Sequence, residues 1–135
     1  MKVLLIGATG NLGLRLIPAL LSHGHTVIAY VRDPPKLASL LPPAIHSRIS
    51  VVQGSATDSA AIKQAIQDTA CEAVVNTAGV AALAPWAKSD LPQIFRTVVN
   101  AVVEAGVLRG QPLRAWFLGG TGVLNYPGTQ SLVSD

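Results

Sequence analysis

Short apolar runs alternate along the chain with longer segments in which apolar residues recur at helical spacing. The runs predict five strands, at Lys2–Ile6, Thr26–Val31, Arg48–Gln53, Glu72–Asn76 and Leu113–Leu118. The segments between them predict four helices, at Asn11–His23, Pro34–Leu41, Ser59–Asp68 and Leu91–Leu108. Strands that alternate with helices in this way are typical of an α/β domain with a parallel sheet and right-handed crossovers.

The predicted strands are almost continuously apolar, which indicates a sheet covered by helices on both faces. The composition agrees, because 50% of the 135 residues are hydrophobic and 13% are charged. We therefore predict one doubly wound, Rossmann-type domain over residues 1–135, with the spatial strand order 3-2-1-4-5. A ligand is then expected above the carboxyl ends of the first and fourth strands, where the order reverses.

A glycine-rich run, Gly7-Ala8-Thr9-Gly10-Asn11-Leu12-Gly13, joins the first predicted strand to the first predicted helix. Glycines permit a tight turn, let the backbone approach a ligand closely and let the helix pack on the strand. The turn also gathers free backbone N–H groups and the positive end of the helix dipole, which suits a pyrophosphate. The residues expected to hold the pyrophosphate are Gly7, Thr9, Gly10, Asn11, Leu12 and Gly13.

The formal net charge is +3 at pH 7. The Lys and Arg side chains are scattered and form no basic block, which argues against a nucleic-acid partner. The small positive excess suits an anionic ligand, and it is equally the balance of a basic protein without one. No residues have the spacing of metal ligands.

The single cysteine, Cys71, excludes an internal disulfide and agrees with a reducing compartment. Because Cys71 lies just ahead of an apolar strand, we interpret it as a packing residue and not as a nucleophile. No signal peptide and no apolar run of about 20 residues is visible in the chain. We expect a cytoplasmic protein without a membrane span.

Four segments together resemble the short-chain dehydrogenase/reductase superfamily. They are GATGNLG at residues 7–13, YVRDPPKL at 30–37, NTAG at 76–79 and WFLGGTGVLNYPG at 116–128. The last segment is most similar to the atypical NAD(P)-binding branch, which includes NmrA-like proteins and flavin or biliverdin reductases. The resemblance spans nearly the whole chain and implies a dinucleotide cofactor.

The end of the second strand decides between NAD and NADP in such folds. A carboxylate there binds the ribose 2′-OH of NAD, whereas an arginine accommodates the 2′-phosphate of NADP. This chain has Arg32 at that position and Lys36 one turn further on, so we predict NADP(H) over NAD(H). Asp33, which follows directly, favours the opposite choice. Arg32 as a solvated surface charge is the alternative.

The resemblance also implies contacts for the rest of the cofactor. In related proteins an aspartate after the third strand often receives the adenine amino group, but this chain has Ser55 there, followed by Ala56. Asp58 is instead expected to be the N-cap of the next helix. The backbone expected to pass beneath the cofactor is Asn76, Thr77, Ala78 and Gly79. An ordinary turn at the strand end is the alternative for Ala78 and Gly79.

Many members of the superfamily use a Tyr-x-x-x-Lys pair as proton donor, and this chain lacks it. The residue four positions after Tyr30 is proline, and the one four positions after Tyr126 is glutamine. Thr121 is a candidate hydrogen-bond donor to a substrate carbonyl, with a turn role as the alternative. His23, His25 and His46 receive no catalytic role.

We therefore expect an atypical reductase that transfers hydride from NADPH to a small carbonyl, enone or flavin-like acceptor. A dinucleotide sensor without enzymatic activity and a tailoring protein without redox activity are the alternatives. The chain is short for this branch, so it is a fragment, a truncated product or a protein completed by a partner. An exposed sheet edge favours a homo-oligomer, with Leu91–Leu108 as the helix that meets a second copy.

Overall fold

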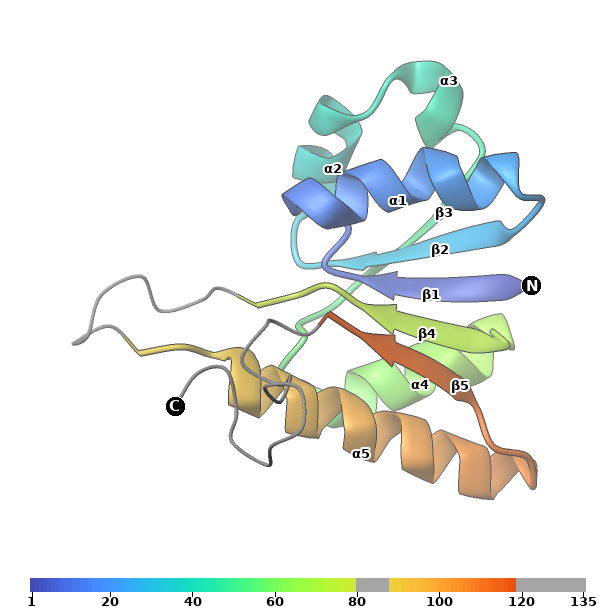
Figure 1. The fold of residues 1–135 in the computed structure, drawn as a ribbon, viewed down its shortest axis with the longest axis vertical. Coiled ribbons are helices and arrows are strands. Elements are labelled where there is room, and N and C mark those ends of the chain that lie inside the picture. The colour runs from blue at the N-terminus through green and yellow to red at the C-terminus, as the bar shows by residue number, and fades with distance from the viewer. Residues whose placement is uncertain (80–87, 119–135) are drawn as a thin grey trace, which may run out of the picture.

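Five parallel strands form the centre of the protein in a computed structural model, which describes residues 1–79 and 88–118 (Figure 1). The strands are β1 (Lys2–Ile6), β2 (Thr26–Val31), β3 (Ser50–Gln53), β4 (Ala73–Asn76) and β5 (Arg114–Phe117). They pair in the order β3-β2-β1-β4-β5, and every neighbouring pair is parallel. The predicted doubly wound fold and its strand order are confirmed.

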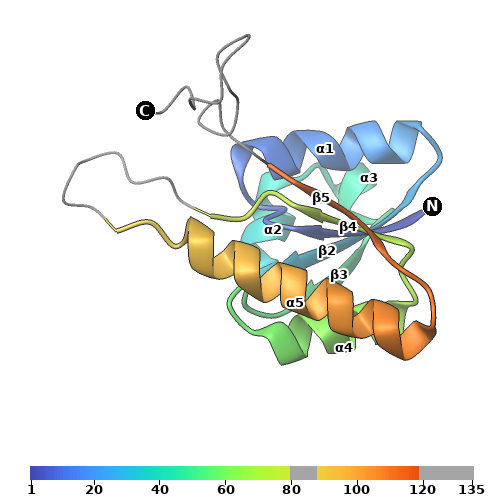
Figure 2. The same cartoon turned by 60° about the horizontal axis from the view of Figure 1, so that its bottom comes forward.

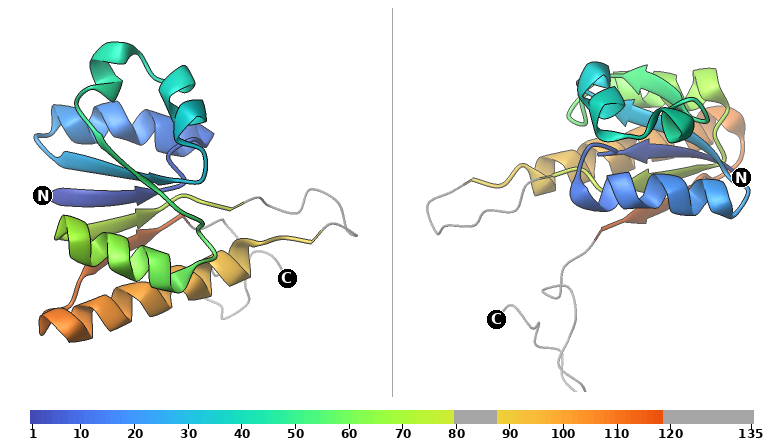
Figure 3. Two further views of the ribbon diagram at one scale, coloured as in Figure 1. Left: turned by 180° about the vertical axis from the view of Figure 1, so that it is seen from behind. Right: turned by 90° about the horizontal axis from the view of Figure 1, so that it is seen from above.

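Helices cover both faces of this sheet. They are α1 (Asn11–Ser22), α2 (Pro34–Leu40), α3 (Pro43–His46), α4 (Ser59–Thr69) and α5 (Leu91–Arg109). Figures 2 and 3 show α4 and α5 together on one face and α1 on the other. Leu37 of α2 packs in the same buried cluster as Ile17 of α1. The four predicted helices are present, with ends that differ from the prediction by one residue.

The short helix α3 replaces a loop that the sequence predicted. The sequence predicts that Pro42 and Pro43 close the helix Pro34–Leu41 and that His46 lies in a connecting loop. Pro42 is instead the N-cap of α3, Pro43 lies in its first turn, and His46 is its last residue. Proline fits this position because the first N–H groups of a helix have no helical partner. As a result β3 begins at Ser50, two residues later than predicted.

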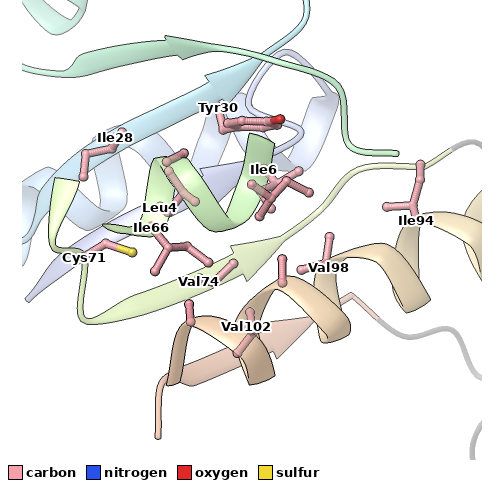
Figure 4. Close-up of a cluster of buried hydrophobic side chains, with 14 residues drawn as sticks. Leu4, Ile6, Ile28, Tyr30, Ile66, Cys71, Val74, Ile94, Val98 and Val102 are labelled. Carbon is pink, nitrogen blue, oxygen red and sulfur yellow. The ribbon is translucent and has the colours of Figure 1, made fainter. Parts of the chain in front are cut away.

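The alternation of side chains along each strand divides the core into two layers. Leu4 and Ile6 of β1 pack with Ile66 of α4 and Val98 of α5, as Figure 4 shows. Leu5, between them, packs on the opposite face against α1 and α2. Successive side chains of a strand point to opposite faces, so one apolar strand supplies both layers.

The long helix α5 has the length and hydropathy of a membrane span, which the sequence analysis did not recognise. Its 19 residues contain an 18-residue window of mean hydropathy 1.2. One face of the helix is nevertheless part of the core, through Ile94, Val98 and Ala101. One such helix is weak evidence for a membrane span, because the core helix of a globular domain passes the same test.

Candidate functional site

A groove of about 240 Å³ lies at the carboxyl ends of the strands, where the strand order reverses between β1 and β4. Five segments line it: the glycine turn after β1, the end of β2, the loop between β3 and α4, the end of β4 and the start of α5. These segments are far apart in the sequence. Parallel pairing brings them together, because it places all carboxyl ends at one edge of the sheet.

The glycines of the first turn have different structural roles. Gly7 has φ +85°, and a Cβ there would lie 2.5 Å from the backbone nitrogen of Ala78. A Cβ at Gly13 would overlap the carbonyl oxygen of Gly7, so this glycine allows α1 to pack on the turn. At Gly10 the nearest protein atom to a Cβ would be 3.4 Å away. Gly10 therefore leaves space on the groove side that the fold itself does not need.

The N-terminus of α1 has no side-chain cap. Its N-cap is Gly10, and no side chain makes a capping hydrogen bond there. The first backbone N–H groups of a helix have no helical acceptor, and the helix dipole is positive at this end. Gly7, Thr9 and Gly10 line the groove, while Asn11, Leu12 and Gly13 form the adjoining first turn of α1. An anionic diphosphate fits this arrangement of amides.

The end of β4 forms the next part of the groove. The Thr77 hydroxyl donates to the carbonyl oxygens of Ile6, at 3.0 Å, and Gly7, at 3.2 Å, and so joins this strand to the glycine turn. Thr77, Ala78 and Gly79 line the groove. Asn76 does not, because its side chain is buried and its Oδ1 accepts the Ala78 N–H at 3.2 Å. The segment is thus both a strand-end turn and a wall of the groove.

The end of β2 contributes Arg32, whose exposed side chain lines the groove. The carboxylate of Asp33 is engaged elsewhere: it is the N-cap of α2, and its Oδ1 accepts the Lys36 N–H at 3.0 Å. Lys36 is exposed but is not among the groove-lining residues. Arg32, Asp33 and Lys36 are the three charged residues that bear on the choice of cofactor. Of these three, only Arg32 lines the groove.

The loop between β3 and α4 lies against Tyr30 of β2. The Tyr30 hydroxyl donates to the carbonyl oxygen of Ser55 at 2.9 Å, and Gly54 lies against the hydroxyl end of the Tyr30 side chain, where a Cβ would overlap it. Burial, with a smaller contribution from the Asp58 carboxylate, raises the pKa of Tyr30 to about 12. Asp58 caps α4 by accepting the Ala61 N–H at 3.0 Å, as predicted.

Several groove-lining residues were not recognised from the sequence. Tyr30 was considered only as half of an absent catalytic pair, and Thr57, Asp90 and Ile94 were not considered. The position of Tyr30 near the end of a predicted strand was the available signal, because strand ends border the switch point. Thr121 and Tyr126 lie outside the described residues.

The other reactive residues lie away from the groove. Cys71 is fully buried in the layer beneath α4 and α5, and burial raises the pKa of its thiol. This agrees with a packing role. His23 and His25 flank the turn between α1 and β2, at the amino end of β2. Within residues 1–79 and 88–118, no three His, Cys, Asp or Glu side chains are grouped to hold a metal ion.

A doubly wound sheet with a glycine turn and an uncapped helix at its switch point defines a nucleotide-binding domain of the Rossmann type. Comparison with known proteins specifies the family. The NAD(P)H-binding family model matches residues 7–112, and the chain belongs to this family. It is an atypical, NAD(P)-binding domain similar to the short-chain dehydrogenases/reductases, as the sequence motifs indicated.

A curated relative is the phenylcoumaran benzylic ether reductase IRL1 of Ginkgo biloba, with 30% identity over 112 residues. The match covers 80% of this chain and 33% of the reductase. One similar structure is serine dehydrogenase from Escherichia coli, with 24% identity and a TM-score of 0.72, where the match covers 95% of this chain and 66% of that one. Another is the Bordetella bronchiseptica enzyme WbmG in complex with NAD, with 28% identity and a TM-score of 0.62, where the match covers 78% of this chain and 34% of that one. The chain spans about a third of the curated relative's length.

Proposed function

We propose that the chain binds NADP(H) and acts in hydride transfer to a small carbonyl, enone or flavin-like acceptor. The observation that carries the proposal is the continuous groove from the uncapped start of α1 to Arg32. The diphosphate would lie on the amides of the glycine turn, and the nearby ribose would lie at the end of β2. The reductase relative and the NAD-bound structural neighbour support a nicotinamide cofactor.

The preference for NADP depends on which charges reach the ribose. A carboxylate at the end of β2 would repel a 2′-phosphate, but Asp33 is committed to capping α2. Arg32 lines the groove and can pair with the phosphate through two parallel N–H groups. Arg32 lines the groove and Asp33 does not, which supports NADP(H) over NAD(H).

When bound, NADPH supplies the hydride. Residues 1–135 contain no Tyr-x-x-x-Lys pair, and their proposed contributions are binding, orientation and exclusion of water. Tyr30 does not replace that tyrosine, because its hydroxyl is bonded to Ser55 and its pKa is raised. We propose a cytoplasmic protein that acts on a small molecule.

The test combines binding with turnover. The purified chain is titrated with NADPH, and absorbance at the nicotinamide band is followed with a panel of quinones, enones and flavins. Tight binding with consumption of NADPH by at least one acceptor class supports the reductase. Tight binding without turnover points to a dinucleotide sensor instead, and no dinucleotide binding at all points to a non-redox protein on the same scaffold.

A further inference from the structure

The groove ends at the loop between β3 and α4, and this end has an unusual set of hydrogen-bonding groups. If the diphosphate lies on α1 and the ribose lies by Arg32, the base attached to that ribose lies against the loop, because Gly54, Ser55, Ala56 and Thr57 line the groove there. The inference below therefore rests on the proposed function. It concerns which base this loop accepts.

Two of the loop residues that line the groove, Ser55 and Thr57, carry hydroxyl groups. The hydroxyl oxygens of Ser55 and Thr57 are 2.8 Å apart, and Ser55 Oγ also accepts the Thr57 N–H at 3.2 Å. The nearest carboxylate in the sequence, that of Asp58, caps α4 and is not among the groove-lining residues. Base recognition at this end therefore depends on uncharged groups.

The number of hydroxyl hydrogens determines how many hydrogen bonds the pair can donate to a ligand. The two groups carry two hydrogens, and the bond between them uses one of them. If Thr57 donates within the pair, Ser55 keeps its hydrogen; if Ser55 donates, Thr57 keeps its own. In both cases one donor remains, and Thr57 Oγ1 retains a lone pair. A carboxylate at the same place could only accept.

We propose that the Ser55–Thr57 hydroxyl pair reads the 6-position of the purine without distinguishing an amino group from a carbonyl oxygen. The pair can accept a hydrogen bond from a 6-amino group or donate one to a 6-oxo group by rotating its hydroxyls. At this position the pair therefore adds no preference for the adenine form of the dinucleotide over the hypoxanthine form. A carboxylate would reject the 6-oxo base, because two acceptors would face each other.

The loop is held in place independently of the ligand, so it need not fold around one particular base. The Tyr30 hydroxyl and the Asp58 N–H both bond to the Ser55 carbonyl oxygen, at 2.9 and 3.2 Å. Gly54 is confined by the Tyr30 ring. The backbone is therefore fixed, and adjustment to the base is left to the two hydroxyl hydrogens.

The experiment compares two ligands and three proteins. Dissociation constants for NADP⁺ and for nicotinamide hypoxanthine dinucleotide phosphate are measured by calorimetry with the wild type, Ser55→Asp and Ser55→Asn. Aspartate and asparagine have the same size, but only asparagine has a donor. The preference for adenine is expected to be similar in the wild type and Ser55→Asn, and at least about tenfold larger in Ser55→Asp, the discrimination of one lost hydrogen bond.

The ratio of the two dissociation constants, compared between the three proteins, reports on recognition of the purine 6-position. Both ligands carry the same phosphates. Hypoxanthine also has a hydrogen on N1, where adenine has a lone pair, but N1 meets the same backbone in all three proteins, so this difference cancels when the ratios are compared between proteins. A wild-type preference for adenine as large as that of Ser55→Asp overturns the inference, as does an unchanged ratio in Ser55→Asp. If that variant does not fold, a wild-type preference for adenine at least about tenfold larger than that of Ser55→Asn overturns it. Failure of the wild type to bind either ligand overturns the proposed function itself.

Discussion

The hydroxyl of Tyr30, near the end of β2, donates a 2.9 Å hydrogen bond to the carbonyl oxygen of Ser55, which lies 25 residues further along the chain. This bond joins two walls of the groove. The Tyr30 ring is almost completely buried, with 2% of its surface exposed, and it lies directly against Gly54. The shape of the far end of the groove therefore depends on one side chain from a neighbouring strand.

Replacement of this tyrosine by phenylalanine, Tyr30→Phe, should lower stability by about 0.5–1.5 kcal/mol, the net value of one hydrogen bond. The Ser55 carbonyl keeps the Asp58 N–H, so the loop is expected to persist with weaker support. Urea unfolding gives the stability, and a titration with NADPH gives the affinity. A loss of more than about 3 kcal/mol would show that the ring packing, and not the bond, was disturbed.

The raised pKa of Tyr30 predicts a dependence of stability on pH. The folded pKa is about 12, against the ordinary tyrosine value of 10.0, so the unfolded chain loses this proton first as pH rises. The contribution of Tyr30 to stability is therefore complete below about pH 10 and is lost as pH rises toward 12. Unfolding of wild type and Tyr30→Phe across this range measures it. Equal slopes for the two proteins would contradict the assignment.

Two glycines of the first turn should separate folding from binding. Gly13→Ala places a Cβ on the carbonyl oxygen of Gly7 and should destabilise the fold by about 1–3 kcal/mol. Gly10→Ala meets no protein atom closer than 3.4 Å, so it should fold with a loss of about 1 kcal/mol or less. It should nevertheless weaken dinucleotide binding, because Gly10 lines the groove and the added methyl group takes up space beside the proposed diphosphate.

Thermal unfolding and calorimetric titration with NADPH measure these two effects. The matched pair makes the result decisive, since both changes add the same methyl group. Normal dinucleotide affinity in a folded Gly10→Ala protein would place the diphosphate elsewhere.

The choice of cofactor depends on Arg32. Removal of its guanidinium in Arg32→Ala should cost about 1.5–3 kcal/mol of NADP binding, the value of hydrogen bonds to a charged group, and leave NAD binding nearly unchanged. Thermal shift with each dinucleotide provides the measurement. Arg48→Ala is the control, because Arg48 is exposed and precedes β3 at its amino end. Equal stabilisation of the wild type by NAD and NADP would refute the preference.

The outer face of α5 carries an apolar patch formed by Val103, Val107 and Leu108, which are 58%, 75% and 64% exposed. A groove of about 360 Å³ adjoins it. Such a surface favours association, and we expect the purified chain to form a homo-oligomer. Light scattering after size exclusion should show that Val107→Lys lowers the mass to that of the monomer, whereas Ser39→Lys, at an exposed site of α2 on the other face of the sheet, does not. A monomeric wild type contradicts the expectation.

The fold was largely predictable because its signals are local. Strand β1 and helix α1 follow from an apolar run, a glycine turn and helical periodicity within 22 residues. Once strands and helices alternate, the handedness of the crossovers leaves few ways to order the sheet. Helix α3 was missed because Pro42 and Pro43 end one helix and begin another, and the same residues are compatible with both.

The sequence predicted the candidate site only where the groove wall is formed by backbone. The glycine turn and the residues after β4 could be placed from the sequence, since a strand end and its next turn are neighbours in both sequence and space. The sequence did not predict whether the charged side chain at the groove is Arg32 or Asp33. Arg32 and Asp33 are adjacent, and only the start of α2 commits the carboxylate to a cap.

By itself the sequence determined a doubly wound sheet and the position of its glycine turn, because periodicity and turn chemistry act over a few residues. Tertiary structure alone decided that Tyr30 holds Ser55, that Asn76 is buried and that Asp90 reaches the groove. These relationships join segments that meet only when the strands pair side by side. Their physical origin is the packing of side chains across the sheet, which no local pattern of residues specifies.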